Sequence, residues 1–357
     1  MTRRLFARLV AALSLGGLTS LAGAGILDSA PAAASSSNIT PFEQQRGTEQ
    51  TFLTFPEWFL VHSPAEYATY IQTHTPSAFP FIGHIRQFWQ SYGKVYDASN
   101  DGYPFNFGYH VMIMVIGTST TVEYGIRSAY ETLIGRISDA TQSGALTEED
   151  RYGARIAQDY VDFIRVKPWY EYDFTAKLFG LWKETSPTGP HMIRKWERRY
   201  ALTTEYGAKA LYGWLIMKAT RAGYDEAVEA TAVVLDRLPE GAVNDLTQLT
   251  VLKSLPDGEV LATVPRYQAF TSYAMALAQR QIAFREIAGN RGPILVSVLT
   301  KSAIDSSALS ATVLFEQPII TEPGTTRVAL VLPVPALTPA LTRLAAQGVV
   351  IEHIYDY

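Results

Sequence analysis

The chain has 357 residues, of which 47% are hydrophobic and 18% charged, a composition that is typical of globular proteins and argues against general disorder. Its length favours two domains. A net charge of −4 gives no sign of the concentrated basic surface that nucleic-acid binding needs, so we expect no nucleic-acid partner. The chain has no cysteine, which excludes disulfides, thiolate metal ligands and cysteine nucleophiles.

The N-terminus predicts export. Residues 2–8 are basic and include the pair Arg3-Arg4, residues 9–27 carry no charge, and three consecutive alanines follow. This pattern predicts a signal peptide over residues 1–34 and a periplasmic protein, and the arginine pair also fits the twin-arginine route. The alternative is that residues 9–27 remain as an anchor in the inner membrane, because about 20 apolar residues span a bilayer.

The polar residues 35–50 predict a linker, and residues 51–250 predict a mainly helical domain that is rich in aromatic side chains. At its start, residues 54–61 have the character of a short extended segment. The sequence Ser-Pro-Ala-Glu at 63–66 forms a capping box with proline at the first helical position, which predicts that a helix begins there. A weaker helical pattern continues to Leu238.

The stretch from residue 105 to residue 136 begins almost without charge and could be mistaken for a membrane span. Its asparagine, its glycines and the Thr-Ser-Thr-Thr run at 118–121 are too polar for an isolated lipid-facing helix. We therefore predict a buried helix of a globular domain.

From residue 255 the pattern changes to short strands that alternate with helices at 267–288 and 338–347, and the chain ends on a strand at 349–355. The expected order, β-α-β-(β)-β-α-β, predicts a ferredoxin-like (split βαβ) domain over residues 255–357 and hence an α+β fold class. No internal repeat is apparent. A terminal strand at a sheet edge would be a candidate for pairing with a second copy of the chain, giving a homo-oligomer.

Two sets of charged residues have the spacing of one helix face. The first set is Glu123, Arg127 and Glu131, and the second, on a later helix, is Arg198, Glu205 and Lys209. The sets are complementary in sign, so we predict that the two helices pack with the sets facing each other. One interpretation is a structural network of ion pairs. The other is a polar site in an aromatic cavity, where a glutamate acts as acid or base and Arg127 or Lys209 holds an anionic group.

The sequence favours the structural interpretation but leaves both open. His84 and His110 lie in apolar segments near the charged stretch, where they could join a site or be satisfied core histidines. The candidate catalytic residues are Glu123, Glu131, Glu205 and Lys209, and the candidate ligand-binding residues are Arg127, Arg198, His84, His110 and Tyr206. There is no HExxH motif and no histidine pair at metal-ligand spacing, so we predict no metal site. The sequence identifies no cofactor.

Four segments carry a resemblance: Pro56-Glu57-Trp58, the aromatic run 168–172, Glu-Arg-Arg at 197–199, and Glu-Tyr-x-x-Lys-Ala-x-Tyr at 205–212. In these segments the chain resembles a group of uncharacterised bacterial proteins that have a leader or an N-terminal membrane anchor. The resemblance covers roughly residues 50–220. It implies that export or anchoring is shared, and it implies no activity.

Together these features predict an exported envelope protein that binds a hydrophobic or anionic small molecule, or a protein partner, at the periplasmic face of the membrane. The membrane surface itself is a candidate partner because the chain is rich in aromatic side chains. The alternative is an enzyme whose carboxylate acid–base site is buried in the helical domain.

Overall fold

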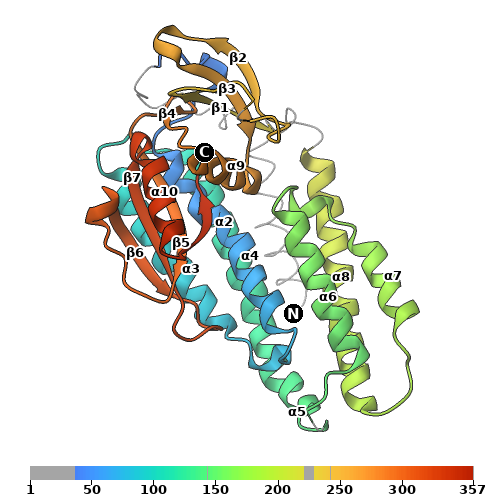
Figure 1. Cartoon of the computed structure of the whole chain (residues 1–357). Coiled ribbons are helices and arrows are strands. Elements are labelled where there is room, and N and C mark those ends of the chain that lie inside the picture. The colour runs from blue at the N-terminus through green and yellow to red at the C-terminus, as the bar shows by residue number, and fades with distance from the viewer. Residues whose placement is uncertain (1–36, 143, 221–228, 242, 357) are drawn as a thin grey trace.

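The computed structural model describes residues 37–142, 144–220, 229–241 and 243–356. A helical region comes first and two antiparallel four-stranded sheets follow, which confirms the α+β class (Figure 1). The predicted signal peptide and anchor lie outside the described residues. Within the described ranges, no helix is both long and apolar enough to span a membrane.

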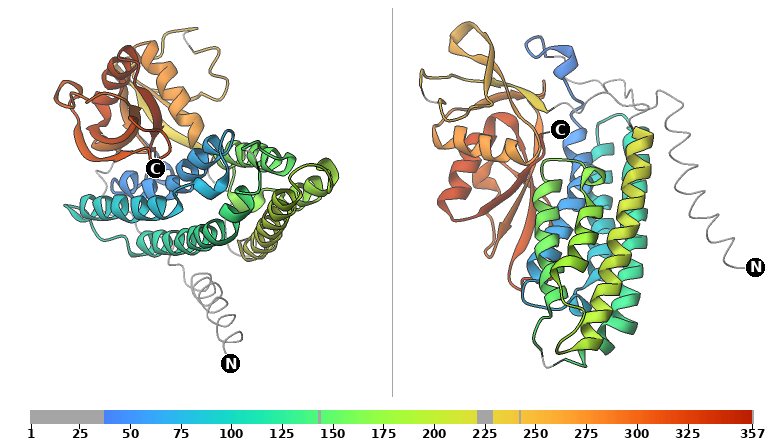
Figure 2. Two further views of the ribbon diagram at one scale, coloured as in Figure 1. Left: turned by 90° about the horizontal axis from the view of Figure 1, so that it is seen from below. Right: turned by 90° about the vertical axis from the view of Figure 1, so that its right-hand side faces the viewer.

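The helical region is a bundle arranged around α2. Its main helices are α2 (Gln50–Tyr70), α3 (Phe81–Asn100), α4 (Phe107–Tyr130), α6 (Glu148–Ile164), α7 (Phe174–Glu184) and α8 (Met192–Thr220). A π-helical turn, Glu131–Gly135, follows α4 directly and leads into the short helix α5 (Arg136–Asp139). Helix α2 contacts α3, α4 and α6, whereas α8 packs against α6 and α7 (Figure 2).

Helix α2 overturns two local predictions. Residues 54–61 are helical rather than extended, and the helix runs through both of its prolines instead of beginning near Ser63. Tertiary packing overrides the local signals, because α2 is buried on more than one side. Phe55 packs against the second sheet, and Phe59 packs against α3.

The predicted linker, residues 35–50, is packed against the protein over its described part. Ile39 joins the apolar cluster on one face of the first sheet. Thr40 Oγ1 donates to the buried carboxylate of Glu286 at 3.2 Å. The segment after residue 37 therefore covers part of that sheet face.

Strands begin earlier than the predicted domain boundary. The first sheet contains β1 (Ala230–Leu235), β2 (Thr250–Ser254), β3 (Val260–Pro265) and β4 (Phe284–Ile287), and the second contains β5 (Pro293–Thr300), β6 (Thr312–Pro318), β7 (Thr326–Pro333) and β8 (Val350–Ile354). The helical domain does not extend to residue 250, because the apolar run that ends at Leu235 is a strand buried over most of its length.

The two sheets repeat one unit, which spans residues 230–287 (the first repeat) and 293–354 (the second repeat). The strand orders are β2-β3-β1-β4 and β6-β7-β5-β8, so equivalent positions are filled in the same chain order. In each repeat the first strand lies between the third and fourth and is antiparallel to both. The helices α9 (Gln268–Gln279) and α10 (Leu337–Ala346) make the connections. Each repeat thus contains its own split βαβ, and the strands of 255–357 do not form one sheet.

The pairing register is repeated as well. Val233 of β1 pairs with Ile287 of β4, and its counterpart Val296 of β5 pairs with Ile354 of β8. In both repeats this pairing shifts its register after the next residue of the first strand. Both repeats also have a register shift in the pairing between their second and third strands. The start of β2 and the start of β6 share the pattern Thr-Val-Leu-x-x-x-Pro. The expectation that the chain has no internal repeat is therefore wrong.

Two apolar cores hold these parts together. One joins the two repeats and includes α9 and α10, which contact each other. The other lies between the helices and the second repeat, where the Phe55 ring is 5.0 Å from that of Phe315 and 5.5 Å from that of Tyr355. Thr51 Oγ1 donates to the Tyr355 carbonyl and accepts from the Leu295 N–H, both at 2.9 Å. These two bonds join the start of α2 to β5 and to the residue that follows β8.

Strand β8 lies at the edge of the second sheet, as predicted, but α9 covers part of that edge. The Ile354 N–H donates to Thr271 Oγ1 of α9 at 3.0 Å, and Gln268 Nε2 of the same helix donates to the Glu352 carbonyl. Because α9 covers this side, the free edge on which we based the predicted homo-oligomer is not present at these residues.

Candidate functional site

The two charged sets face each other across α4 and α8, as predicted, and form the charged ladder (Glu123, Arg127, Glu131, Arg198, Glu205 and Lys209). Lys209 Nζ lies 3.2 Å from Glu123 Oε1 and 2.9 Å from Glu205 Oε1. Arg127 bridges the same two glutamates, at 3.2 Å from Glu205 Oε2 and 3.6 Å from Glu123 Oε1. Farther along the helices, Arg198 Nη2 lies 2.9 Å from Glu131 Oε1.

The contacts at the Lys209 end fix the charge states there. Burial alone would raise the pKa of Glu205, but Arg127 and Lys209 lower it to about 2. Burial would lower the pKa of Lys209, but Glu123 and Glu205 raise it above its ordinary value. The Arg127 guanidinium also lies 4.5 Å from the centre of the Tyr67 ring. Glu205 and Lys209 are therefore both ionised at neutral pH and lack the intermediate pKa that acid–base catalysis uses.

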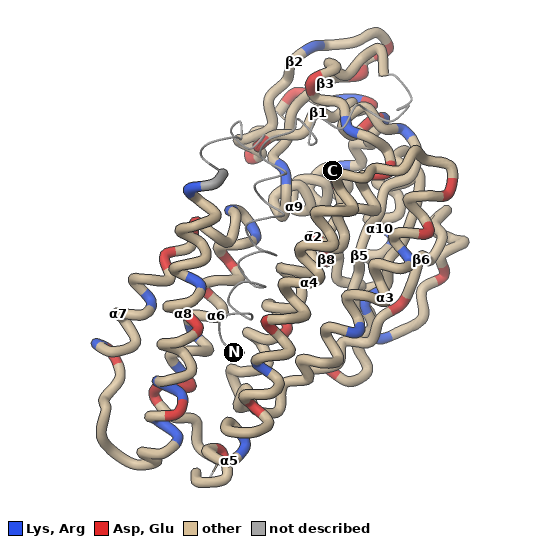
Figure 3. The backbone as a smooth tube through the Cα atoms, turned by 180° about the vertical axis from the view of Figure 1, so that it is seen from behind, with Lys and Arg blue, Asp and Glu red and all other residues tan. Residues whose placement is uncertain are grey.

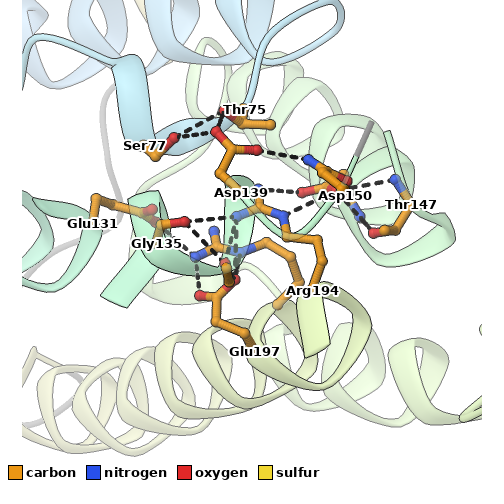
Figure 4. A network of polar contacts seen from close by, with 12 residues as sticks. Thr75, Ser77, Glu131, Gly135, Asp139, Thr147, Asp150, Arg194 and Glu197 are labelled. Atoms are coloured by element: carbon orange, nitrogen blue, oxygen red, sulfur yellow. Dashed lines mark hydrogen bonds and ion pairs between the residues drawn. The ribbon is translucent and has the colours of Figure 1, made fainter. Parts of the chain in front are cut away.

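At its other end the ladder joins a buried ionic network that the sequence did not predict (Figure 4). The fully buried Arg194 places Nη2 2.8 Å from Asp150 Oδ1 and Nη1 3.2 Å from Glu197 Oε2. Arg198 also contacts Glu197, and the Tyr130 hydroxyl donates to Glu197 Oε1 at 2.8 Å. Asp150, Glu197 and Glu131 each face an arginine, which is the arrangement that makes buried charges tolerable.

Part of this network was visible in the sequence. Arg194 stands four residues before Arg198, so both share a helix face. Asp150 reciprocates the hydrogen bond of Thr147 in a capping box at the start of α6. The second role of Asp150, as a partner of Arg194, depends on how α6 and α8 pack and has no local signal.

Glu131 differs from the other carboxylates of the ladder because one of its buried oxygen atoms has no hydrogen-bond partner. It begins the π-helical turn, and its Oε2 atom is buried without a hydrogen-bond partner. Burial raises its pKa, against the opposing effect of Arg198. A Cβ atom at Gly135 would lie 2.1 Å from Glu131 Oε2, so the carboxylate occupies space that only glycine leaves free. Single π turns are frequent at functional sites, which keeps Glu131 a candidate.

The remaining predicted ligand-binding residues do not join the ladder. His84 Nδ1 lies 2.9 Å from Ser63 Oγ, and burial lowers the pKa of His84 to about 4. His110 Nδ1 lies 3.0 Å from the Tyr92 hydroxyl. Tyr206 is buried in the aromatic cluster of α6, α7 and α8. Both histidines are thus core histidines with a polar partner.

A second buried ionic cluster, also missed, joins α2 to the second repeat. Arg327 donates twice to the Glu352 carboxylate, at 2.7 Å each, and once to Glu66 Oε1 at 3.0 Å. His62 Nδ1 lies 3.5 Å from Glu352 Oε1, and burial lowers the pKa of His62 to about 4, so it is neutral at pH 7. The sequence gives no signal for this cluster, since its members are up to 290 positions apart.

The outward side of α4 and α8 exposes an unusually large number of apolar side chains. We call it the α4–α8 face. Its large apolar side chains, each at least 41% exposed, are Met114, Val115, Val122, Ile126, Leu133, Ile134 and Ile137 from α4 to α5, and Ile193, Trp196, Tyr200, Leu211, Trp214 and Leu215 from α8. The prediction that 105–136 is a buried helix is therefore only half right, because one side of α4 is buried and the other is exposed.

Charged residues are absent from the exposed positions of α4 and of α8 up to Leu215. In the view from behind, the upper half of α4 carries no charge (Figure 3). Glu123, whose side chain is 43% exposed, turns toward Lys209 at the side of the face. Helix α6 shows the ordinary pattern instead, since its exposed positions include Arg151 and Arg155.

Among the described residues, no group of three or more His, Asp or Glu side chains is arranged to hold a metal ion. No protein-family model, curated protein or solved structure matches this chain. The ladder, the buried ionic clusters and the α4–α8 face are therefore the features from which its function has to be argued.

Proposed function

We propose that this protein is an exported envelope protein that attaches to a membrane surface through the α4–α8 face. One observation carries the proposal: the outward positions of two adjacent long helices are uncharged and mostly large and apolar. Apolar patches of this extent on soluble proteins mark interaction sites. In this proposal the charged ladder is structural, and it fixes α4 beside α8 so that their apolar sides form one surface.

A bilayer suits this face better than a small ligand does. The apolar side chains follow two helices along their length on the outward side of the bundle. Tyr200 and Trp214 have the mixed apolar and polar character that favours the lipid interface. The exposed cations Arg136 and Lys218 lie at the ends of the face, where they can meet lipid headgroups. Export, predicted from the leader, would bring the protein to the membrane.

The test is co-sedimentation of the whole protein with phospholipid vesicles. Ile126→Lys and Leu211→Lys each place a charge within the face, at positions that are 62% and 61% exposed. Because a lysine costs about 2.5–3.5 kcal/mol at the centre of a bilayer and less near the lipid interface, each variant should bind vesicles at least about tenfold more weakly. Val166→Lys is the matched control, since Val166 is 69% exposed but lies outside the face.

A protein partner would give a different result. If wild-type protein is dimeric without lipid and Ile126→Lys is monomeric, the face is an interface between two copies of the chain. Equal vesicle binding by Ile126→Lys, Leu211→Lys and Val166→Lys would refute attachment through this face.

The enzyme alternative rests on Glu131 alone, because its buried carboxylate has an atom without a partner. Glu131→Gln keeps the shape and removes the acid. If the role is enzymatic, cells that carry the variant should behave like cells that lack the protein, although the variant is folded. If the role is structural, function and stability should be lost together.

For the C-terminal region we infer that the two repeats arose by duplication of one strand–strand–strand–helix–strand unit. The shared pairing register, the shared bulges and the pattern at the starts of β2 and β6 support this. We propose that each repeat is related to the ferredoxin-like plan through its split βαβ.

A further inference from the structure

The first repeat has an open pocket, whereas side chains of α2 occupy the corresponding position of the second repeat. The pocket has a volume of about 250 Å³, and its lining residues are Ile39, Val234, Glu259, Arg285, Arg291 and Pro335. It lies on the same face of the first sheet as Ile39, and that sheet is near the top of the molecule in Figure 1. It is separate from the α4–α8 face and does not depend on the membrane proposal.

The duplication identifies the counterparts of the two central side chains. Glu259 directly precedes Val260, as Arg327 precedes Val328. Arg285 is the bulged residue in the pairing of β1 with β4, and Glu352 is the bulged residue in the pairing of β5 with β8. Both repeats therefore hold one acid and one base at the same two backbone positions, with the signs exchanged.

The partners of these side chains differ between the repeats. In the second repeat, Glu66 of α2 reaches Arg327 at 3.0 Å and His62 lies 3.5 Å from Glu352, so the socket is filled by a helix. Arg327 is 2% exposed there. In the first repeat, no carboxylate from a helix is found among the residues that line the pocket. The Arg285 side chain is 51% exposed, and its ion pair with Glu259 is a loose one of 3.6 Å.

Arg291 adds a second guanidinium that is held in place. Its Nε and Nη2 atoms both donate to Glu286 Oε1, at 3.0 Å and 2.6 Å, and Glu286 is fully buried. The Arg291 side chain is nevertheless 59% exposed. Val234, Ile39 and Pro335 supply an apolar wall beside the two guanidinium groups.

We propose that this pocket binds a carboxylate carried on a short apolar stem, with Arg285 as the main charged contact. Arginine suits this role because its planar donors match a carboxylate in two parallel hydrogen bonds. In the second repeat a carboxylate on a short apolar stem, that of Glu66, likewise binds an arginine, although Arg327 corresponds in position to Glu259 and not to Arg285. The apolar wall selects such a group over a bare inorganic anion.

Titration of the isotopically labelled whole protein with glutarate, followed by NMR, tests the proposal. Glutarate should shift the signals of the pocket residues. Arg285→Gln should weaken binding at least about tenfold, because a charge-assisted contact is lost. Arg280→Gln is the control, as Arg280 belongs to the same repeat but pairs with Asp245 outside the pocket lining. Inorganic phosphate should bind more weakly than glutarate.

Two sources of the carboxylate are distinguished by a second titration with a helical peptide that carries one glutamate. Binding of the peptide alone assigns the pocket to a protein partner, and binding of glutarate assigns it to a small molecule. Either result supports the carboxylate socket if Arg285→Gln abolishes it. Failure of both probes to bind, or binding that Arg285→Gln leaves unchanged, would overturn the proposal.

Discussion

At the scale of single residues, Arg194 shows how strongly the fold depends on paired charges. It is fully buried between Asp150 and Glu197. Arg194→Met leaves both carboxylates without this cation, so we expect a loss of about 3–5 kcal/mol in the free energy of unfolding. Denaturation with urea measures it.

Arg155→Met is the control for that experiment. Arg155 pairs with Glu184, and both side chains are more than half exposed. Removing an exposed pair should change the unfolding free energy by less than about 1 kcal/mol. Equal effects of the two substitutions would contradict the structural role given to the buried network.

Buried titratable groups predict an unusual dependence of stability on pH. Burial raises the pKa of Asp356 and of Glu57 to about 7. The unfolded chain ionises these groups at lower pH, so their contribution to stability is lost as the pH rises through about 7. Burial lowers the pKa of His62 and His84 to about 4, so their contribution is lost as the pH falls from about 6.5 toward 4.

Between about pH 4.5 and 6.5 the two effects oppose each other and largely cancel, so stability should be nearly constant there and should fall as the pH rises from about 6.5 to about 7.5. Asp356→Asn retains a group that can accept the 2.9 Å hydrogen bond from Thr231 and removes the ionisation. The variant should lose less stability than the wild type between pH 6 and pH 8. Urea unfolding at several pH values measures this, and identical pH profiles would count against the raised pKa of Asp356.

The residue scale also shows what a sequence can reveal about a site. The ladder could be predicted because the helical period alone fixes which charges share a face, and complementary sign pairs the faces. The cluster of Arg327 with Glu352 and Glu66 could not, because its members come from a strand, another strand and a distant helix. Their meeting is a consequence of how the helices pack on the second repeat.

At the scale of elements, α4 explains why a helix predicted as buried is exposed on one side. In its first half α4 has apolar residues on most sides, so the sequence contains no polar face that would mark the side exposed to solvent. The structure buries the side that carries Ile113, Gly117 and Tyr124 and leaves the side of Val122 and Ile126 open. Periodicity identifies the helix but cannot identify which of two apolar sides meets the core.

Gly117 gives a test of this packing. A Cβ atom there would lie 2.4 Å from a Phe88 ring atom and 2.9 Å from a Trp89 ring atom of α3. Gly117→Ala should therefore separate α3 from α4 and destabilise the protein by about 1–3 kcal/mol. Thermal and urea denaturation report the change.

Gly125 of the same helix is the matched control. A Cβ atom there would point into open space, with no neighbouring element of the described structure within 4 Å. Gly125→Ala should stabilise the protein by about 0.5–1 kcal/mol, because alanine favours the helix. If both substitutions have the same sign, the close approach of α3 to α4 at Gly117 is wrong.

At the scale of the whole molecule, the internal repeat could not be recognised in the sequence because the side chains of the two repeats differ where their surroundings differ. Phe315 packs against α2, whereas its counterpart Lys253 faces solvent. The pair Glu259–Arg285 reverses the signs of Arg327–Glu352. Only the backbone plan and the short pattern at the starts of β2 and β6 remain alike.

These counterparts make a matched experiment. Phe315→Ala removes a buried ring from the core between the helices and the second repeat, so it should cost about 3–5 kcal/mol. Lys253→Ala at the equivalent position should change stability by less than about 0.5 kcal/mol. Calorimetry should show that Phe315→Ala lowers the transition of the helical region as well. A shift confined to the sheets would show that the two regions unfold independently.

The bonds of Thr51 to Leu295 and Tyr355 have a consequence for biosynthesis. They span 244 and 304 positions, so the first helix cannot complete its packing until the ribosome has released nearly the whole chain. Throughout translation the aromatic side of α2 lacks the surface that buries it. A nascent chain of this kind therefore stays incompletely folded until its synthesis is nearly complete.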